Sequence, residues 1–279
     1  MKHTIYKVTA FSNDTQGGNP AGVVLGADSF TDEDMLKIAK EVGYSETAFV
    51  MQSESADFKV RFFTPVDEVD LCGHATVATF NLLRDLKVIT IGDYTQETKA
   101  GILKLQIYNQ YIYMEQNTPN FHEIIKKNEI VKCFKSQYNE YISDSPIQIV
   151  STGLKDIILP VKNLEILLNL QPNLELIDRI SRKYDVVGIH AFCLDTMHSG
   201  DAHTRNFAPR YGIDEESATG TASGALACYM TKYYKDTSRS NFIIEQGFCM
   251  KRPSKIMVKV NSIDDEIKAV FVGGSAVLI

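Results

Sequence analysis

One stretch in the first half of the chain reads as a helix with no polar face. From Gly73 onward nearly every residue is apolar or small, with Val77 and Phe80 among the larger ones. A helix that is apolar on every side must be buried on every side, so the surrounding chain has to wrap around it. Its first free N–H groups, near Gly73, His74 and Ala75, would then point into protein, where they form a ready anion site.

The same design recurs in the second half of the chain. The segment 205–209, RNFAP, repeats the R-x-F-x-P spelling of 61–65, RFFTP. An acidic stretch follows in both places, and GTAS at 220–223 then echoes GHAT at 73–76. Such a repeat indicates duplicated halves. We therefore expect two helix N-termini to face one another across a cleft, where their dipoles favour a bound carboxylate.

Alternating apolar runs predict many strands, with one long buried helix in each half. This pattern indicates the α+β class, with two pseudo-symmetric halves, each a rolled, mostly antiparallel sheet around a central helix. We expect the first half to span residues 1–118, completed by residues 270–279, and the second half to span residues 119–269.

Local signals predict where several elements begin and end. Thr31 and the acids after it predict a helix that Gly43 terminates, and apolar periodicity predicts helices over 73–86 and 174–184. A first strand is expected from His3 to Phe11. A turn is expected at 17–20, and a helix plus linker over 120–145.

Composition narrows the class of protein. The chain has 279 residues and a net charge of −6, which argues against a nucleic-acid surface. It lacks an apolar run long enough to cross a membrane, and its N-terminus alternates like a strand without a signal-peptide core. The five cysteines are scattered and form no C-x-x-C pair, so neither zinc nor a disulfide framework is indicated. We expect a reduced, cytoplasmic protein.

Four side chains near the repeated motifs can carry chemistry, and each has a plainer interpretation. Glu46 is either a solvated carboxylate at a strand edge or an acid/base group in an apolar cleft. His74 is either structural or a donor to a bound anion and a proton carrier. Glu216 is either an exposed acid favoured by a helix dipole or a cleft residue. Cys72 is either a small buried hydrophobe or a thiolate stabilised by a helix N-terminus.

As a set, these motifs resemble the phenazine biosynthesis PhzF-like family, and the match runs almost from end to end. The matching segments are GNPAGV at 18–23, SETAFV at 45–50, RFFTP at 61–65, CGHAT at 72–76, STGL at 151–154, the stretch 212–222, QG at 246–247 and RPS at 252–254. The resemblance implies a diaminopimelate epimerase-like fold with the active site between its two halves, and a homodimer.

The resemblance also implies roles for individual residues. In the phenazine enzyme of this family, a glutamate is the general acid/base in the isomerisation of a dihydro-hydroxyanthranilate. That glutamate matches Glu46, the histidine of its GHAT motif matches His74, and the acid of its second-half motif matches Glu216. We expect a cofactor-independent isomerase that binds no metal and acts on a small-molecule carboxylate. The expected substrate contacts are Asn19, Ser45, Gly73, Ala75, Gly220, Thr221 and Ala222.

The second-half motif departs from the family pattern. The family usually reads EDPATGSA, whereas residues 215–222 read EESATGTA. The acid is longer by one methylene, and Ser217 in place of proline loosens the loop. The related epimerases use two opposed cysteines. Here the first resembles Cys72 but the second resembles Thr219, which cannot serve as a thiolate base.

Two competing hypotheses remain at this point. The altered motif around Glu216 favours a binding or interaction protein that has kept the fold and lost efficient chemistry. A weaker alternative is a Cys72-dependent racemase or lyase. Loss of activity in Cys72→Ala but not in Glu46→Gln would favour the latter.

Overall fold

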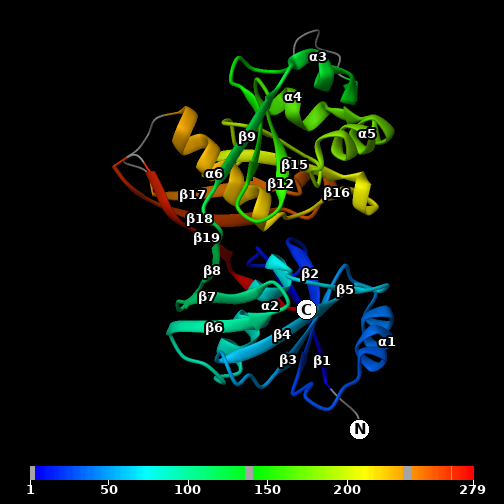
Figure 1. Ribbon diagram of the computed structural model, residues 1–279, viewed down its shortest axis with the longest axis vertical. Helices are drawn as coiled ribbons and strands as arrows, with labels where there is room; N and C mark the ends of the chain where they lie inside the picture. The colour runs from blue at the N-terminus through cyan, green and yellow to red at the C-terminus, as the bar shows by residue number, and fades with distance from the viewer. Residues whose placement is uncertain (1–3, 136–140, 235–239, 265) are drawn as a thin grey trace. The chain divides into compact units, whose positions relative to one another are not determined.

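The computed structural model describes residues 4–135, 141–234, 240–264 and 266–279. The chain divides into two compact units (Figure 1). Unit 1 comprises residues 1–115 and 273–279, and unit 2 comprises residues 116–272. No helix in the described ranges has the length and apolar character needed to cross a membrane.

Unit 1 consists of strands around one central helix, α2. Its elements are β1 (Ile5–Ala10), β2 (Asn19–Leu25), α1 (Asp32–Val42), β3 (Thr47–Met51), β4 (Phe58–Phe63), β5 (Glu68–Val69), α2 (Gly73–Asp85), β6 (Gly92–Thr98), β7 (Gly101–Ile107), β8 (Ile112–Gln116, which ends at the boundary) and β20 (Ala276–Leu278). Most pairings are antiparallel, and β2–β3 and β4–β6 are parallel. The chain's last strand, β20, pairs with its first, β1, and so completes unit 1.

Unit 2 repeats this order around its own central helix, α6. Its elements are β9 (Asn120–Ile125), α3 (Lys127–Ile130), η1 (Val131–Cys133), β10 (Phe134–Lys135), β11 (Ile147–Ser151), β12 (Lys155–Pro160), α4 (Leu164–Asn169), β13 (Gln171–Pro172), α5 (Leu174–Tyr184), β14 (Ile189–Cys193), β15 (Ala202–Ala208), η2 (Pro209–Tyr211), β16 (Ile213–Glu216), α6 (Gly220–Tyr233), β17 (Asn241–Gln246), η3 (Phe248–Met250), β18 (Ser254–Ile263) and β19 (Glu266–Gly274, which runs past the boundary).

The pairings of the two units correspond strand by strand. In unit 2, β12–β14 and β15–β17 are parallel, as β2–β3 and β4–β6 are in unit 1. The pairings beside them, such as β11–β12, β14–β15 and β17–β18, are antiparallel. The predicted fold class, two similar halves that each wrap a mostly antiparallel sheet around a helix, is confirmed.

Both central helices are buried as their compositions predict. In α2 every residue from His74 to Leu83 is buried, and in α6 every residue from Ala222 to Met230 is buried. Neither helix has an acidic residue in its first turn, and neither N-cap side chain bonds to the helix. The first amides of both helices are therefore not satisfied by a side-chain cap.

The flanking helices follow their local signals. Thr31 accepts the amide of Asp34 in a reciprocal capping box, and Gly43 adopts the left-handed conformation that ends α1. Such a cap is worth about 1 kcal/mol. α5 spans the predicted residues, begins at the N-cap Asn173 and ends at Asp185, which is also left-handed.

Some predicted elements are wrong. Asn19 and Pro20 open β2 rather than lying in a turn, because they pair with Ala10 and Thr9 of β1. The segment 120–145 contains the strand β9, whose partner β11 is distant in sequence. Residues 136–140 of that segment, and His3 of the predicted first strand, lie outside the described residues.

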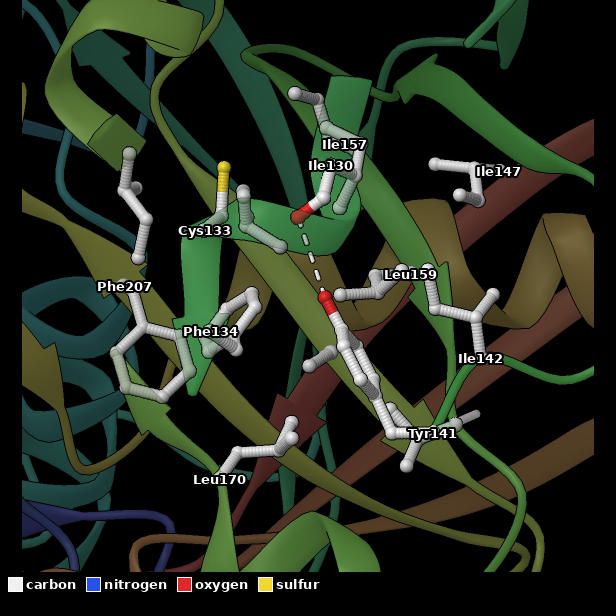
Figure 2. Packing of buried hydrophobic residues seen from close by; sticks show 14 of the residues in the cluster. Ile130, Cys133, Phe134, Tyr141, Ile142, Ile147, Ile157, Leu159, Leu170 and Phe207 are labelled. Atoms are coloured by element: carbon white, nitrogen blue, oxygen red, sulfur yellow. Dashed lines mark hydrogen bonds between the residues drawn. The ribbon is translucent and has the colours of Figure 1, made fainter. Parts of the chain in front are cut away.

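A hydrophobic core fills the side of the unit 2 sheet that α4 and α5 cover. Ile157 and Leu159 of β12 and Phe207 of β15 belong to this core (Figure 2). Tyr141 lies within it, and its hydroxyl donates to the carbonyl of Ile130 at 3.2 Å. Because side chains alternate along a strand, the residues between these positions point to the other face, towards α6.

Candidate active site

The start of α2 is fixed by hydrogen bonds to the carbonyl of its N-cap residue, Cys72, whose side chain makes no cap hydrogen bond. The amide and the hydroxyl of Thr76 both donate hydrogen bonds to the carbonyl of Cys72, at 3.0 and 2.8 Å. We call this pair of bonds the hydroxyl clamp, and it marks the point where the chain enters the helix at Gly73. A Cβ added at Gly73 would lie 3.6 Å from the side chain of Met114. The side chains of Cys72 and His74 are thereby held next to the helix start.

Glu46 lies against His74 in this part of unit 1. Glu46 directly precedes β3, and its Oε2 lies 3.3 Å from Nε2 of His74. The contact does not meet hydrogen-bond geometry, so Oε2 is buried without a hydrogen-bond partner among the described residues. The hydroxyl of Ser45 lies 3.4 Å from the same nitrogen. A buried carboxylate oxygen with no donor is poised to accept a proton.

The other side of the imidazole faces a thiol. Sγ of Cys72 lies 3.3 Å from Nδ1 of His74. Burial lowers the pKa of His74, and the nearby Glu46 only partly opposes this effect. The ring is therefore neutral near pH 7, with one nitrogen as donor and the other as acceptor.

The same three side chains offer a possible set of metal ligands. Glu46, Cys72 and His74 each present one ligand atom, and these atoms lie within 4.8 Å of one another. Carboxylate, thiolate and imidazole are ligands that zinc accepts, but a zinc site needs a fourth ligand. Within the described ranges, no other group of three such side chains is this close together.

The start of α6 in unit 2 has the same backbone but different side chains. Ser223 turns its amide and hydroxyl to the carbonyl of Thr219, as Thr76 does to Cys72. The hydroxyl of Thr219 donates to Oε2 of Glu216, and Gln246 donates to the Glu216 carbonyl at 2.8 Å. Glu216 is half-buried and held by these contacts.

The repeated R-x-F-x-P motif supports both helix starts in the same way. Arg61 makes a two-pronged contact with Glu68 in unit 1, and Arg205 makes one with Glu215 in unit 2. Each guanidinium also lies over the phenylalanine two residues later, at 5.1 and 4.9 Å from the ring centroids. Glu215 is thus held in a structural contact, whereas the adjacent Glu216 accepts from the hydroxyl of Thr219.

The other predicted contact residues belong to the same two regions. In unit 1, Asn19 is buried at the start of β2, Ser45 is exposed, and Gly73 and Ala75 form the first turn of α2. In unit 2 the first turn of α6 holds the predicted glycine, threonine and alanine, at positions 220, 221 and 222. The structure brings Ser45, Glu46 and His74 together, with Cys72 beside them.

Sequence reasoning missed Asp156, a buried acid of unit 2. Asp156 of β12 is 1% exposed, and neither carboxyl oxygen has a hydrogen-bond partner among the described residues. Burial, followed by the negative charge of Glu216, raises the pKa of Asp156 to about 8. The signal was an acid placed directly before the apolar run IILP in this strand, KDIILP.

Comparisons with known proteins identify the family of this chain. The PhzC-PhzF family, described as phenazine biosynthesis-like protein, matches residues 8–279. The chain is 35% identical to the uncharacterized isomerase YfhB of Bacillus subtilis, over 96% of this chain and 94% of that one. It is 24% identical to the trans-2,3-dihydro-3-hydroxyanthranilate isomerase of Pseudomonas aeruginosa, over 98% of this chain and 96% of that one.

A solved structure gives the same result for the fold. The Bacillus anthracis phenazine biosynthesis protein of the PhzF family superposes with a TM-score of 0.92 at 35% identity, covering 100% of this chain and 98% of that one. The chain therefore belongs to the phenazine biosynthesis-like (PhzF) protein family and is an isomerase of that family.

Proposed function

We propose that the protein is a cofactor-independent isomerase in which Glu46 moves a proton on a small carboxylate substrate. The observation that carries this proposal is Oε2 of Glu46, a buried carboxylate oxygen with no hydrogen-bond donor, 3.3 Å from a neutral imidazole. A carboxylate in that position can take a proton from carbon and return it, because no described residue donates a hydrogen bond to this oxygen.

The proposed reaction is a hydrogen shift. Glu46 removes a proton from one carbon, and the electrons of the broken C–H bond form a new double bond to the neighbouring carbon. The electrons of the original double bond shift to its far carbon. Glu46 then returns the proton to a second carbon, so atoms and charge balance without an oxidant or reductant. His74 donates to the charge that develops on the substrate, and Glu216 assists as a second acid. The amides at the starts of α2 and α6 suit a carboxylate.

This arrangement and the name of one relative support a class of substrate. The name of the Pseudomonas aeruginosa relative specifies trans-2,3-dihydro-3-hydroxyanthranilate, a cyclic carboxylate with amino and hydroxyl groups. We propose substrates of this general type, with Asn19 and Ser45 as side-chain contacts. A cytoplasmic homodimer remains our prediction, which light scattering of the purified protein would check.

Deuterium wash-in tests the proposal. The protein is incubated in D₂O with trans-2,3-dihydro-3-hydroxyanthranilate and a panel of small cyclic amino carboxylates, and mass spectrometry follows exchange. Glu46→Gln should lower the exchange rate by about 10²–10⁴-fold, the range for loss of a general acid/base. The matched control is Glu41→Gln, an exposed glutamate at the end of α1 whose loss should leave the rate unchanged. Wild-type exchange in the Glu46 variant would refute the assignment.

A second candidate mechanism has a specific observation in its favour. Cys72 lies 3.3 Å from Nδ1 of His74, so a thiolate–imidazole pair could act as the base instead. In that case Cys72→Ala would abolish exchange while Glu46→Gln would retain it. The single-glutamate mechanism predicts the opposite ranking of the two variants.

A further inference from the structure

The two units bring an acid to the start of the central helix by different routes. In unit 1 the amide of Gly22 donates to the carbonyl of Glu46 at 3.1 Å. In unit 2 the amide of Ile157 donates to the carbonyl of Gly188 at 3.0 Å. Both bonds join corresponding parallel strands just before the second strand begins, so Gly188 is the counterpart of Glu46. A Cβ on Gly188 would lie 1.9 Å from the carbonyl oxygen of Phe207, which leaves no room for a side chain there.

The acid of unit 2, Glu216, comes from β16 and is tied to the start of α6. The hydroxyl of Thr219, the N-cap residue of α6, donates to Oε2 of Glu216. The carbonyl of Thr219 is the one that accepts the amide and the hydroxyl of Ser223 in the hydroxyl clamp. A hydroxyl has a single proton, so Thr219 can donate to Glu216 only while its proton is not directed elsewhere.

A buried glutamine contacts both residues of this bond. Gln246 is the last residue of β17 and is fully buried. Its Nε2 donates to Oγ1 of Thr219 at 3.1 Å and to the carbonyl of Glu216 at 2.8 Å. Its Oε1 accepts the amide of Thr219 at 3.1 Å. Both ends of the Gln246 amide are therefore attached to the segment from Glu216 to Thr219.

Backbone contacts decide which end of this amide is the donor. The Thr219 N–H needs an acceptor and the Glu216 carbonyl needs a donor, so Oε1 and Nε2 of Gln246 cannot exchange places. The second proton on Nε2 then goes to Oγ1 of Thr219. Because Oγ1 accepts that proton, its own proton is directed to Glu216. The donors therefore run in one direction, from the glutamine to the hydroxyl and from the hydroxyl to the acid.

Unit 1 has a different residue at the position of this glutamine. Counted from the repeated R-x-F-x-P motif, the parallel pairs β4–β6 and β15–β17 align Thr98 with Gln246. Thr98 donates to the carbonyl of Gly101 at 3.0 Å and accepts the amide of Ala100, so it closes its own turn. The glutamine therefore belongs to the unit whose acid comes from β16, and it is not required by the shared backbone plan.

The charged groups next to this chain of bonds are engaged with other partners. Glu245 comes directly before the glutamine, but its carboxylate accepts from His203 at 3.1 Å. Glu215 comes directly before Glu216 and makes the two-pronged contact with Arg205. Glu216 is the acid that the Thr219 hydroxyl joins to the glutamine, so a change in its protonation should be felt at the glutamine amide.

We propose that Gln246 is a positioning residue for the isomerase reaction, which holds Glu216 in place by fixing the hydroxyl of Thr219 as its donor. Without the Nε2 donor, the hydroxyl is free to rotate and the carboxyl of Glu216 loses its fixed partner. Hydrogen bonds to a charged group are about twice as strong as neutral ones, so this loss should be felt in the rate. The effect of Gln246 on the reaction passes through Glu216 and rests on the proposed function.

A measurement without substrate tests the chain of bonds itself. The side-chain amide of Gln246 is followed by ¹⁵N NMR in the intact protein from pH 3 to 9. Its signals should move as Glu216 gains a proton, and they should stay constant in Glu216→Gln. The movement should largely disappear in Thr219→Val, which removes the hydroxyl but keeps the carbonyl that the hydroxyl clamp uses. Signals that ignore pH in wild type, or that move equally in Thr219→Val, would overturn the proposal.

Deuterium wash-in with the substrate panel tests the effect on the reaction. Gln246→Glu keeps the size of the side chain and the acceptor for the Thr219 amide, but it replaces the N–H donor with a carboxylate oxygen. The exchange rate at saturating substrate should fall about 10–100-fold at pH 8, the effect of one hydrogen bond to a charged group, with KM little changed. At lower pH the new carboxyl gains a proton and again donates to Thr219, so the rate relative to wild type should recover.

A matched variant and a double mutant separate positioning from mere stability. Gln148 is also buried in unit 2 and uses both ends of its amide, with the carbonyl of His122 and the hydroxyl of Tyr233. Gln148→Glu should lower the urea midpoint without a pH-dependent change in the relative exchange rate. In the Thr219→Val background, Gln246→Glu should lower the rate no further, because the hydroxyl through which it acts is gone.

The outcomes also separate this proposal from the proposed function. Fully additive losses in the double mutant, or no recovery of Gln246→Glu at low pH, would overturn the positioning role. The NMR comparison of wild type with Thr219→Val stays decisive even if Gln246→Glu fails to fold. If the NMR response is seen as expected but no compound exchanges, the chain of bonds stands and the proposed function fails.

Discussion

The two units share a backbone plan but differ in what lies at the start of the central helix. In unit 1 the helix start carries a thiol and an imidazole, with Glu46 brought in by the strand next to it. In unit 2 the same position on the strand is Gly188, and the acid Glu216 comes from β16. The Arg–Glu contact and the hydroxyl clamp at the helix start are retained in both.

This difference shows which positions are free to vary. The hydroxyl clamp fixes the helix start and the Arg–Glu contact joins the two strands before it, so the loss of either would disturb the fold of its unit. Side chains at the helix start face the candidate site and can change without altering the strand pairing. Function therefore has to be argued from these side chains rather than from the repeat itself.

The largest expected effect concerns the two arginine contacts. The Arg205 side chain is 8% exposed and also donates to the carbonyls of Leu167 and Leu170. Arg205→Ala would leave the half-buried Glu215 and two buried carbonyls without their donor, and we expect a loss of about 3–5 kcal/mol in unfolding free energy. Arg61 is 20% exposed, so water replaces much of what Arg61→Ala removes, and we expect about 1–2 kcal/mol.

Urea unfolding of both variants would measure the contrast. Arg205→Lys serves as the control, since it keeps the charge and loses the two-pronged contact, and it should fall between Arg205→Ala and wild type. Equal losses of unfolding free energy in Arg205→Ala and Arg61→Ala would contradict the expectation that the more buried arginine contributes more to stability.

The next effect concerns buried histidines and pH. Burial lowers the pKa of His190 to about 4, below the ordinary value of about 6.5 that it regains on unfolding. The unfolded chain therefore binds more protons below pH 6.5, and stability falls as the pH drops from 6.5 to 4, by about 3 kcal/mol for this residue. His190→Gln should flatten that part of the stability curve.

His74 of unit 1 provides the comparison. Its pKa is also lowered by burial, but Glu46 partly opposes the shift. His74→Gln should therefore flatten the acid limb of the curve as well. Thermal unfolding between pH 4 and 7 would compare both variants with wild type, and acid limbs parallel to wild type in both would show that neither ring is neutral in the folded state.

Local signals in the sequence were sufficient for much of the fold. Thr31 and Gly43 bound α1, and the apolar composition after Gly73 located α2, because caps and burial leave clear local patterns. The strand β9 was missed because its exposed residues carry no alternation, and only the distant partner β11 makes it a strand. Short α4 was missed for a similar reason, since six residues hold too little periodicity.

The candidate site was less accessible to sequence reasoning. Glu46 and His74 are 3.3 Å apart, yet the sequence pointed to a joint role only through the family resemblance. Asp156 became notable only once the pairing of β12 with β14 placed it opposite Gly188. Such pairings join residues far apart in the chain, and no local pattern encodes them.

A smaller effect should follow from filling the position of Gly188. Its added Cβ would meet the backbone of Phe207, which cannot rotate away, so Gly188→Ala should cost about 1–3 kcal/mol or more. The counterpart Glu46→Ala adds no atoms and should leave stability within about 0.5 kcal/mol of wild type. Urea midpoints would test this pair, and a fully stable Gly188→Ala would contradict the close approach of β14 and β15.

The smallest expected effect separates the thiol from the acid in unit 1. If Glu46 alone moves the proton, Cys72→Ala should lower the exchange rate less than about tenfold, far below the 10²–10⁴-fold expected for a lost acid/base.

Dialysis against EDTA should likewise leave the exchange rate unchanged. Added Zn²⁺ should inhibit by occupying Glu46, Cys72 and His74, and Cys72→Ala should weaken that inhibition. Cys249→Ser, which removes an exposed thiol of unit 2, should be inhibited like wild type. Activity that EDTA removes and Zn²⁺ restores would instead make these three residues a working metal site, and the proton would then have to be moved by a different group.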